Sequence, residues 1–199
     1  KKEVNEHVAR PVILTVTNQK GGVGKTTTSI NVAYTLAKDQ KKRVLLVDFD
    51  PQGNATSGLG LNKDSLERTV LAVIMGTASV DEATVKTAYK NLFLVPATPQ
   101  LANAEVELAK AEQRFTRLRD ALHALQDYDI IIIDSPPSLS LLTVNGLIAA
   151  HDVLLPVQAE FYALEGLGQL LETIQLVRKG MNPTLELLGV LVTMLDNRT

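Results

Sequence analysis

Short runs of consecutive apolar and β-branched residues recur along the chain, and longer stretches of mixed polarity separate them. Apolar residues at about four to eight consecutive positions are typical of strands that are buried on both faces of a parallel sheet. The predicted strands are Val12–Thr17, Arg43–Asp48, Leu92–Val95, Ile130–Asp134, Val153–Val157 and Leu187–Leu195.

The stretches between these runs carry helical signals. In the first of them, apolar residues fall at Ile30, Ala33, Tyr34 and Ala37, which is the spacing of one helix face. The segment Asn54–Gly60 is rich in Gly, Ser and Thr and predicts a loop instead. The predicted helices are Thr26–Lys38, Leu66–Met75, Asp81–Tyr89, Leu101–Gln126 in one or two pieces, Leu139–Ala150 and Leu164–Gly180.

Strands and helices alternate throughout, which predicts an α/β protein with a doubly wound, mostly parallel sheet and helices on both faces. Residues 1–10 are polar and predict a flexible leader, whereas residues 11–199 predict a single domain. The chain starts without Met and ends just past a predicted strand with no closing helix. We therefore expect the C-terminal part of the domain to be incomplete.

The composition excludes several classes of protein. Because the chain has no cysteine, it cannot form disulfides, Cys-ligated zinc sites or iron–sulfur clusters. The net charge of −2 argues against nucleic-acid binding by bulk charge but leaves a local basic patch open. The three histidines, His7, His123 and His151, have no metal-binding spacing. With no signal peptide and no run of roughly 18 apolar residues, we expect a cytoplasmic protein.

A glycine-rich loop directly follows the first predicted strand and directly precedes the first predicted helix. This context is what a phosphate-binding loop requires, because glycines let backbone N–H groups approach phosphate oxygens and the helix N-terminus adds partial positive charge. Lys25 is predicted to reach the β- and γ-phosphates, and the Thr26 hydroxyl to ligate Mg²⁺. The predicted nucleotide-binding residues are Lys20, Gly21, Gly22, Val23, Gly24, Lys25, Thr26 and Thr27.

Aspartates stand at the ends of two further predicted strands. Asp48 ends the second strand and Asp50 follows it, and Asp134 ends the fourth. Because ligands of a parallel sheet bind at the carboxyl ends of its strands, we expect these carboxylates to converge on the loop. There they could hold Mg²⁺ and orient an attacking water, although an aspartate at a strand end is also a common helix cap or turn residue.

The loop departs from the general phosphate-loop pattern in one respect, since Gln19 stands where the first glycine is expected and Lys20 follows it. This K-G-G-x-G-K-T arrangement resembles the deviant Walker A loop of the ParA/MinD group of P-loop ATPases. The resemblance implies that Lys20 reaches across a nucleotide-sandwich dimer to the phosphates bound by the partner. It also implies a catalytic Lys25, an Asp50 that positions the attacking water, and Mg²⁺ held near Asp48, Asp134 and Thr26.

Three segments resemble the Soj branch of this group, which partitions chromosomes, more than the MinD branch; they are Asp48–Gly60, Phe161–Gly166 and Val192–Thr199. The resemblance implies a slow, Mg²⁺-dependent ATPase that forms a homodimer with ATP and is stimulated by a ParB-like partner. It implies nonspecific binding of DNA on the nucleoid rather than a membrane. Arg198 matches a family arginine that is implicated in the DNA-binding surface.

Two alternatives share the fold and the loop. A MinD-like positioning ATPase would bind membranes through a C-terminal amphipathic helix, and this sequence ends too early to show one. A P-loop synthetase of cofactor biosynthesis, forming amides or lactams, would act on a small substrate and would not need Lys20. The basic clusters of the chain are small and interleaved with acids, so composition alone does not establish DNA binding.

Overall fold

The computed structural model describes residues 10–159 and 163–195, so the predicted leader lies almost entirely outside the described residues. In the described part, the strands are β1 (Val12–Val16), β2 (Val44–Asp48), β3 (Val85–Lys86), β4 (Leu92–Val95), β5 (Ile130–Asp134), β6 (Asp152–Gln158) and β7 (Glu186–Thr193). The α-helices are α1 (Lys25–Lys38), α2 (Asn54–Gly58), α3 (Val70–Met75), α4 (Val80–Ala83), α5 (Ala104–Leu108), α6 (Arg117–Leu122), α7 (Leu141–Ala149) and α8 (Ala163–Gly180). Two 3₁₀ helices are η1 (Lys63–Ser65) and η2 (Pro99–Asn103).

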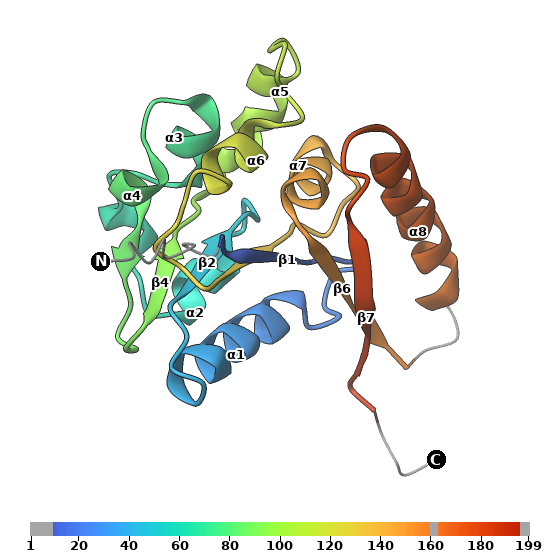
Figure 1. Ribbon diagram of the computed structural model, residues 1–199, viewed down its shortest axis with the longest axis horizontal. Helices are drawn as coiled ribbons and strands as arrows, with labels where there is room; N and C mark the ends of the chain where they lie inside the picture. Colours follow the sequence, from blue (N-terminus) through green and yellow to red (C-terminus); the bar gives the residue numbers. More distant parts are fainter. Residues whose placement is uncertain (1–9, 160–162, 196–199) are drawn as a thin grey trace, which may run out of the picture.

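The strands form one sheet in the order β3-β4-β2-β5-β1-β6-β7 (Figure 1). Every neighbouring pair is parallel except β3 and β4. The connection after β1 leads across β5 to β2, whereas the connection after β5 leads across β1 to β6. The chain thus winds in both directions from β1 and β5, which places the ligand crevice at the carboxyl ends of these two strands.

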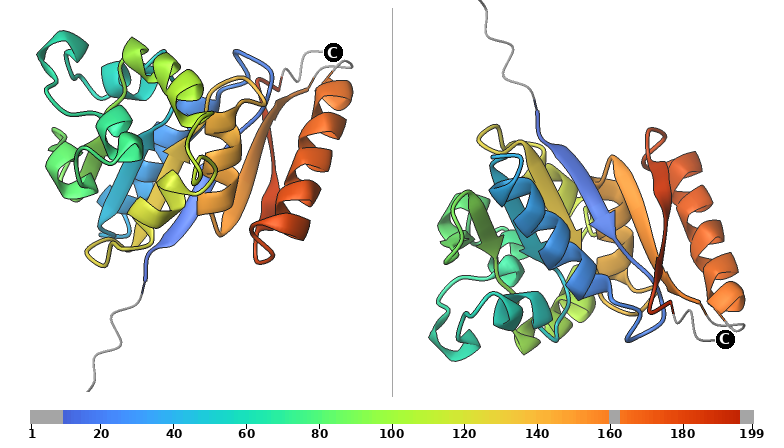
Figure 2. Two further views of the ribbon diagram at one scale, coloured as in Figure 1. Left: turned by 90° about the horizontal axis from the view of Figure 1, so that it is seen from above. Right: turned by 90° about the horizontal axis from the view of Figure 1, so that it is seen from below.

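Helices cover both faces of the sheet. On one face, Leu45 and Val47 belong to a core formed with α3, α6, α7 and α8. On the other, Val44 and Leu46 belong to a smaller core formed with α1 and α2. Figure 2 shows α7 in front of the sheet in one view and α1 in front of it in the opposite view, with α8 beside β7 in both. Alternate residues of the central strands therefore enter different cores. The predicted α/β fold with a doubly wound, mostly parallel sheet and helices on both faces is confirmed.

The last strand differs from the prediction that the apolar runs are buried on both faces. In β7, Leu188 is 61 % exposed and Val192 is 55 % exposed. The strand lies at the end of the sheet, so that only β6 pairs with it in the described part of the chain. An apolar run predicts a strand here, but the run does not determine what covers it.

Two short segments also differ from their predictions. The stretch Asn54–Gly60, predicted as a loop, contains helix α2, which begins after the left-handed Gly53 at φ 59°. The segment Asp81–Tyr89, predicted as a helix, is helical only to Ala83 and then pairs antiparallel with β4 through β3. Because β-branched residues follow this single turn, a strand conformation is favoured there.

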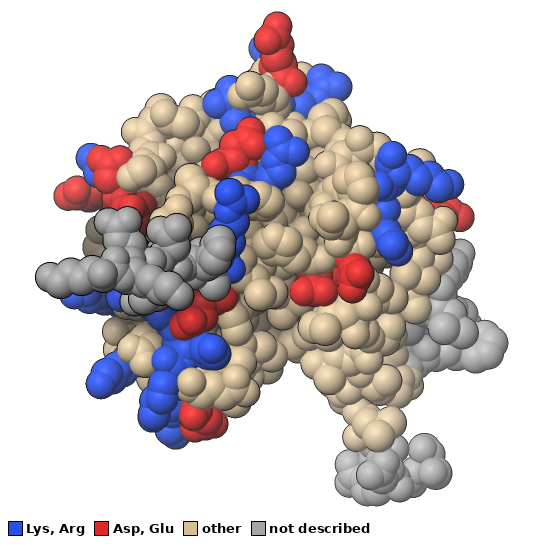
Figure 3. Space-filling view, in the orientation of Figure 1, with Lys and Arg blue, Asp and Glu red and all other residues tan. Residues whose placement is uncertain are grey.

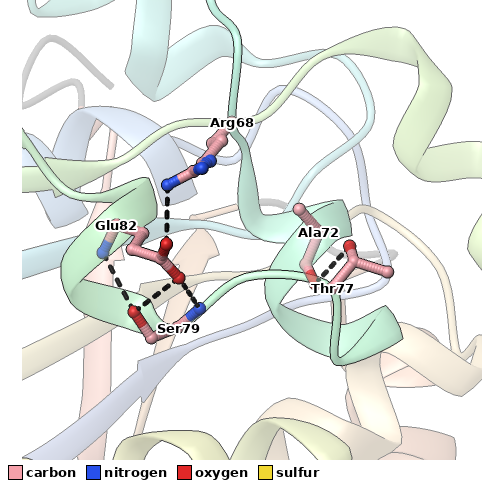
Figure 4. A network of polar contacts seen from close by, with 5 residues as sticks. All are labelled: Arg68, Ala72, Thr77, Ser79 and Glu82. Carbon is pink, nitrogen blue, oxygen red and sulfur yellow. Dashed lines mark hydrogen bonds and ion pairs between the residues drawn. The ribbon is translucent and has the colours of Figure 1, made fainter.

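Polar contacts fix the start of the single-turn helix α4. The Glu82 carboxylate accepts hydrogen bonds from the Ser79 N–H at 2.9 Å and from the Arg68 guanidinium at 2.8 Å (Figure 4). The Ser79 hydroxyl accepts in turn from the Glu82 N–H, which completes a capping box. This local network compensates for the shortness of the helix.

The predicted helical stretch Leu101–Gln126 forms two helical pieces, because η2 runs directly into α5 and α6 follows after a gap. It contains η2, α5 and α6, and no α-helix occupies residues 109–116. Leu101, Leu108, Leu118 and Leu122 are all buried in the larger core. Packing of these leucines therefore decides the path of the chain more than continuous helix propensity does.

Two histidines meet at the edge of the sheet opposite the carboxyl strand ends. The His123 and His151 rings stack with centroids 5.5 Å apart. The Ile13 N–H donates to His151 Nδ1 at 2.9 Å, which requires an unprotonated Nδ1. Burial lowers the pKa of His151, the charge of His123 lowers it further, and Asp152 opposes the shift.

The His151 contact predicts a loss of stability in mild acid. Since the pKa of His151 is lower in the folded than in the unfolded chain, its contribution is complete above the unfolded value of about 6.5 and is lost as the pH falls below it. In His151→Asn, the amide oxygen can accept the same N–H without titrating. Urea unfolding at pH 7.5 and 5.5 should show a smaller decrease in the free energy of unfolding for this variant than for wild type. An identical decrease would contradict the assignment.

Candidate functional site

The glycine-rich loop connects β1 to α1 at the carboxyl edge of the sheet. Gly22 and Gly24 have φ values of 76° and 88°, a left-handed conformation that glycine adopts without strain. Gly24 is the N-cap of α1, and no side chain caps the helix or places a negative charge in its first turn. The N–H groups at the start of this helix are therefore available to an anion.

Lys25 places a cation inside the loop. The residue is 7 % exposed, and its Nζ donates to the Lys20 carbonyl at 2.9 Å. Burial lowers the pKa of Lys25, and the charges of Asp134 and Asp50 partly offset this effect. A lysine held in this way can exchange its carbonyl contact for a phosphate oxygen with little loss of hydrogen bonding.

Asp134 ends β5 directly opposite Asp48 in the parallel register of β2 and β5. Its Oδ1 accepts a hydrogen bond from the Ser29 hydroxyl at 2.9 Å. Its Oδ2 is buried, and no group in the described ranges donates a hydrogen bond to it. Burial and then the charge of Asp48 raise the pKa of Asp134 to about 7. A buried carboxylate oxygen that lacks a protein donor fits a partner such as a Mg²⁺-bound water.

Asp48 is enclosed by its own loop. Its Oδ2 accepts from the Thr56 N–H at 2.7 Å and from the Thr56 hydroxyl at 2.6 Å, and its Oδ1 accepts from the Asp50 N–H at 3.3 Å. Burial raises the pKa of Asp48 to about 6. The carboxylate thus ties α2 and the Asp50 segment to the end of β2. A metal role for Asp48 would require one of these contacts to be exchanged for a metal ion or its water.

Asp50 and the loop face a common cavity of about 270 Å³. The Asp50 Oδ1 accepts from the Gln52 N–H at 2.9 Å, which orients the carboxylate. Predicted site residues that line this cavity are Gly21, Gly22, Gly24, Lys25, Thr26, Thr27 and Asp50. Glycine N–H groups, a lysine, a threonine hydroxyl and a carboxylate therefore converge, which is the set of groups that binds and cleaves a nucleoside triphosphate.

The remaining predicted residues lie around this cavity or beyond it. Val23 is buried and Lys20 is exposed, with the Lys20 N–H donating to Asn18 Oδ1 at 3.0 Å. Asp48 and Asp134 are not among the residues that line the cavity, and Arg198 lies outside the described residues. Across residues 10–159 and 163–195, no three His, Cys, Asp or Glu side chains gather to hold a metal ion. Mg²⁺ at this site would therefore take most of its ligands from phosphates and water.

Comparison with known proteins identifies the family. A family model described as an AAA domain matches residues 12–187. Over 188 residues, 56 % of positions are identical to the sporulation initiation inhibitor protein Soj of Bacillus subtilis, a match that covers 94 % of this chain and 74 % of Soj. The chain belongs to the ParA/Soj family of chromosome-partitioning ATPases. The resemblance of the loop to this family is thereby confirmed.

Other family members and solved structures agree with this membership. The chromosome partitioning protein ParA of Myxococcus xanthus is 54 % identical over 187 residues, which cover 94 % of this chain and 66 % of that protein. A structure named cobyrinic acid a,c-diamide synthase from Mycobacterium smegmatis, with bound ADP and magnesium, superimposes with a TM-score of 0.90 at 46 % identity. That match covers 95 % of this chain and 77 % of the other.

No helix in the described part of the chain combines the length and the apolar character that crossing a bilayer requires.

Several residues of the site were not predicted from the sequence. Thr56 and Ser29 hold the two buried carboxylates, and Thr193 and Gln158 contact the loop from the ends of β7 and β6. Ser29 lies one helical turn after Lys25, so its position on α1 offered a usable signal. Thr56 reaches Asp48 through the turn after β2, and Thr193 and Gln158 reach the loop only because distant strands pair beside it.

Thr56 offers a test of the enclosed carboxylate, because its hydroxyl donates to Asp48 and accepts from the Ala97 N–H at 3.0 Å. Thr56→Val keeps the shape of the side chain but leaves both buried partners without this hydroxyl. We expect the free energy of unfolding, measured in urea, to fall by about 1–3 kcal/mol. Thr56→Ser, which keeps the hydroxyl, should recover most of this loss. Equal stability of the valine variant and wild type would contradict the described network.

Proposed function

We propose that this ParA/Soj-family chain is an ATP-driven molecular switch, which dimerises with ATP, binds DNA nonspecifically and segregates chromosomes or plasmids with a ParB-like partner. The observation that carries the proposal is the cavity shared by the loop, Lys25 and Asp50. The buried Asp134 oxygen that has no donor among the described residues adds to it. The name of the Myxococcus relative, chromosome partitioning protein ParA, supports chromosome partitioning as its setting.

The loop would hold the phosphates of ATP. The N–H groups of residues 21–27 face the phosphate oxygens, and Lys25 exchanges its contact with the Lys20 carbonyl for the β- and γ-phosphates. Thr26 and Asp134, with Asp48 nearby, would hold Mg²⁺, which neutralises charge on the phosphates. The neighbour from Mycobacterium smegmatis, with ADP and magnesium, supports this pair of cofactors.

Hydrolysis would depend on Asp50 and Lys20. Asp50 is fixed by the Gln52 N–H and lines the cavity, where it can accept a hydrogen bond from an attacking water. Lys20 is exposed beside the loop and can extend to phosphates held by a second copy of the chain. A cation supplied by the partner stabilises the charge of the transferred phosphoryl group. Hydrolysis would therefore be slow until a dimer and a ParB-like partner complete the site.

DNA binding would require surfaces of more than one subunit. Figure 3 shows Lys and Arg in small groups with Asp and Glu between them on the face drawn. A dimer unites two such sets and adds Arg198 from each chain, which raises the number of phosphate contacts. Because γ-phosphate contacts across the interface exist only with ATP, the nucleotide selects the dimer and hydrolysis dissolves it.

An amide-forming synthetase is the second candidate, and the name of the Mycobacterium smegmatis neighbour favours it. The two functions differ in what stimulates ATP turnover. A partitioning ATPase responds to DNA and a ParB-like protein, whereas a synthetase responds to a small carboxylate with an amide donor. Turnover that rises only with the carboxylate and the donor would establish the second function.

Asp50→Ala tests the catalytic assignment. We expect ATP affinity to stay within about twofold of wild type while hydrolysis falls by at least 100-fold, because only the orientation of water is lost. Lys25→Ala provides the contrasting variant, in which ATP binding itself is lost. The measurements are calorimetric ATP binding and phosphate release, and wild-type turnover by Asp50→Ala would refute the role of Asp50.

Lys20→Ala tests the dimer and its link to DNA. We expect light scattering to give a dimer for wild type with ATP and a monomer with ADP, and a monomer for the variant with either nucleotide. DNA affinity should follow the dimer and fall steeply as salt rises, since phosphate contacts release counterions. Dimerisation of Lys20→Ala with ATP would show that the lysine does not act across the interface.

A further inference from the structure

Two side chains at the ends of β6 and β7 form hydrogen bonds with carbonyl groups of the phosphate loop. The Thr193 hydroxyl donates to the Val23 carbonyl at 2.9 Å, and Gln158 Nε2 lies 3.4 Å from the Gly22 carbonyl. Thr193 and Gln158 are direct partners in the parallel register of β6 and β7. Adjacent positions of the sheet therefore hold two successive carbonyls of the loop.

Both the hydroxyl and the methyl group of Thr193 make contacts with the loop. Its hydroxyl is also 3.4 Å from the Val157 carbonyl, but a single proton favours the shorter contact with Val23. Its methyl group would lie 3.6 Å from a Cβ built on Gly24, so it packs against the left-handed turn that opens α1. Thr193 thus holds Val23 through its hydroxyl and lies next to Gly24 through its methyl group.

The direction of these carbonyls determines the direction of the loop N–H groups. In a planar trans peptide, the C=O and the following N–H point to opposite sides. Holding the Gly22 and Val23 carbonyls outward therefore turns the N–H groups of Val23 and Gly24 toward the inside of the loop. Successive N–H groups that point the same way form a concave binding site for an anion.

We propose that Thr193 is a positioning residue for nucleotide binding, which acts by holding the Val23 carbonyl so that the Gly24 N–H faces the phosphates. Gln158 assists at the Gly22 carbonyl, through a longer contact that it shares with Met194. The inference rests on the proposed function, since it requires ATP at this loop. By this inference, β7 helps to position the phosphate loop for nucleotide.

The matched variants Thr193→Val and Thr193→Ser separate the hydroxyl from the shape of the side chain. Thr193→Val keeps the branched shape without the proton, and we expect ATP and ADP affinity to fall about five- to tenfold, the equivalent of one hydrogen bond. Because the contact is the same in the ground state and the transition state, KM should rise while kcat stays within about twofold. Thr193→Ser should bind both nucleotides within about twofold of wild type.

Thr173→Val is the control, because the Thr173 hydroxyl donates to the Gln169 carbonyl at 3.0 Å on the exposed surface of α8. It should leave nucleotide affinity unchanged. Nucleotide binding is measured by calorimetry, and the melting temperature without nucleotide is recorded for each variant. A melting temperature of Thr193→Val equal to that of Thr173→Val, together with weaker ATP binding, supports positioning rather than a general loss of structure.

Other outcomes overturn the inference. If wild type binds ATP and Thr193→Val binds it equally well, the hydroxyl has no positioning role, while the proposed function stands. If Thr193→Ser is as weak as Thr193→Val, the hydroxyl is again not responsible. If wild type binds no ATP, the proposed function fails and the inference fails with it. If Thr193→Val does not fold, Gln158→Leu removes the neighbouring contact with the Gly22 carbonyl. Unaltered ATP affinity of Gln158→Leu would then contradict the positioning of the loop by these strand ends.

Discussion

Two carboxylates buried at adjacent strand ends constrain the whole carboxyl edge of the sheet. Asp48 and Asp134 are paired in register, fully buried, and both have raised pKa values, near 6 and 7. Like charges in a poorly solvated place are costly unless donors and cations surround them. Thr56, Ser29 and Lys25 supply part of that compensation. A divalent cation would supply more, so ligand binding and stability are coupled at this edge.

The sequence predicted those elements whose pattern lies within a few consecutive residues. Consecutive apolar residues such as Val44–Val47 identified the central strands, because residues that enter two different cores leave no polar positions between them. The same pattern does not show whether other elements bury a strand, and the apolar residues of β7 are exposed in the structure. Short segments such as α2 and α4 depend on tertiary and capping contacts that outweigh propensity.

The candidate site divides along the same line. The phosphate loop is contiguous, and its glycines, Lys25 and Thr26 could be identified from their order alone. The convergence of Asp50 with that loop followed from the rule that strand ends meet at one edge. Thr56 and Thr193 could not be identified, since a threonine hydroxyl has no distinctive pattern until a distant segment provides its partner.

The contact between Thr193 and Val23 joins positions 170 residues apart in the chain. During synthesis from the N-terminus, the loop emerges well before this strand. The carbonyl of Val23 thus gains its outer anchor only when almost the entire described chain has left the ribosome. With the proposed role of Thr193, full affinity for nucleotide would arise only after β7 has emerged and paired with β6, so a shorter nascent chain would compete poorly for ATP.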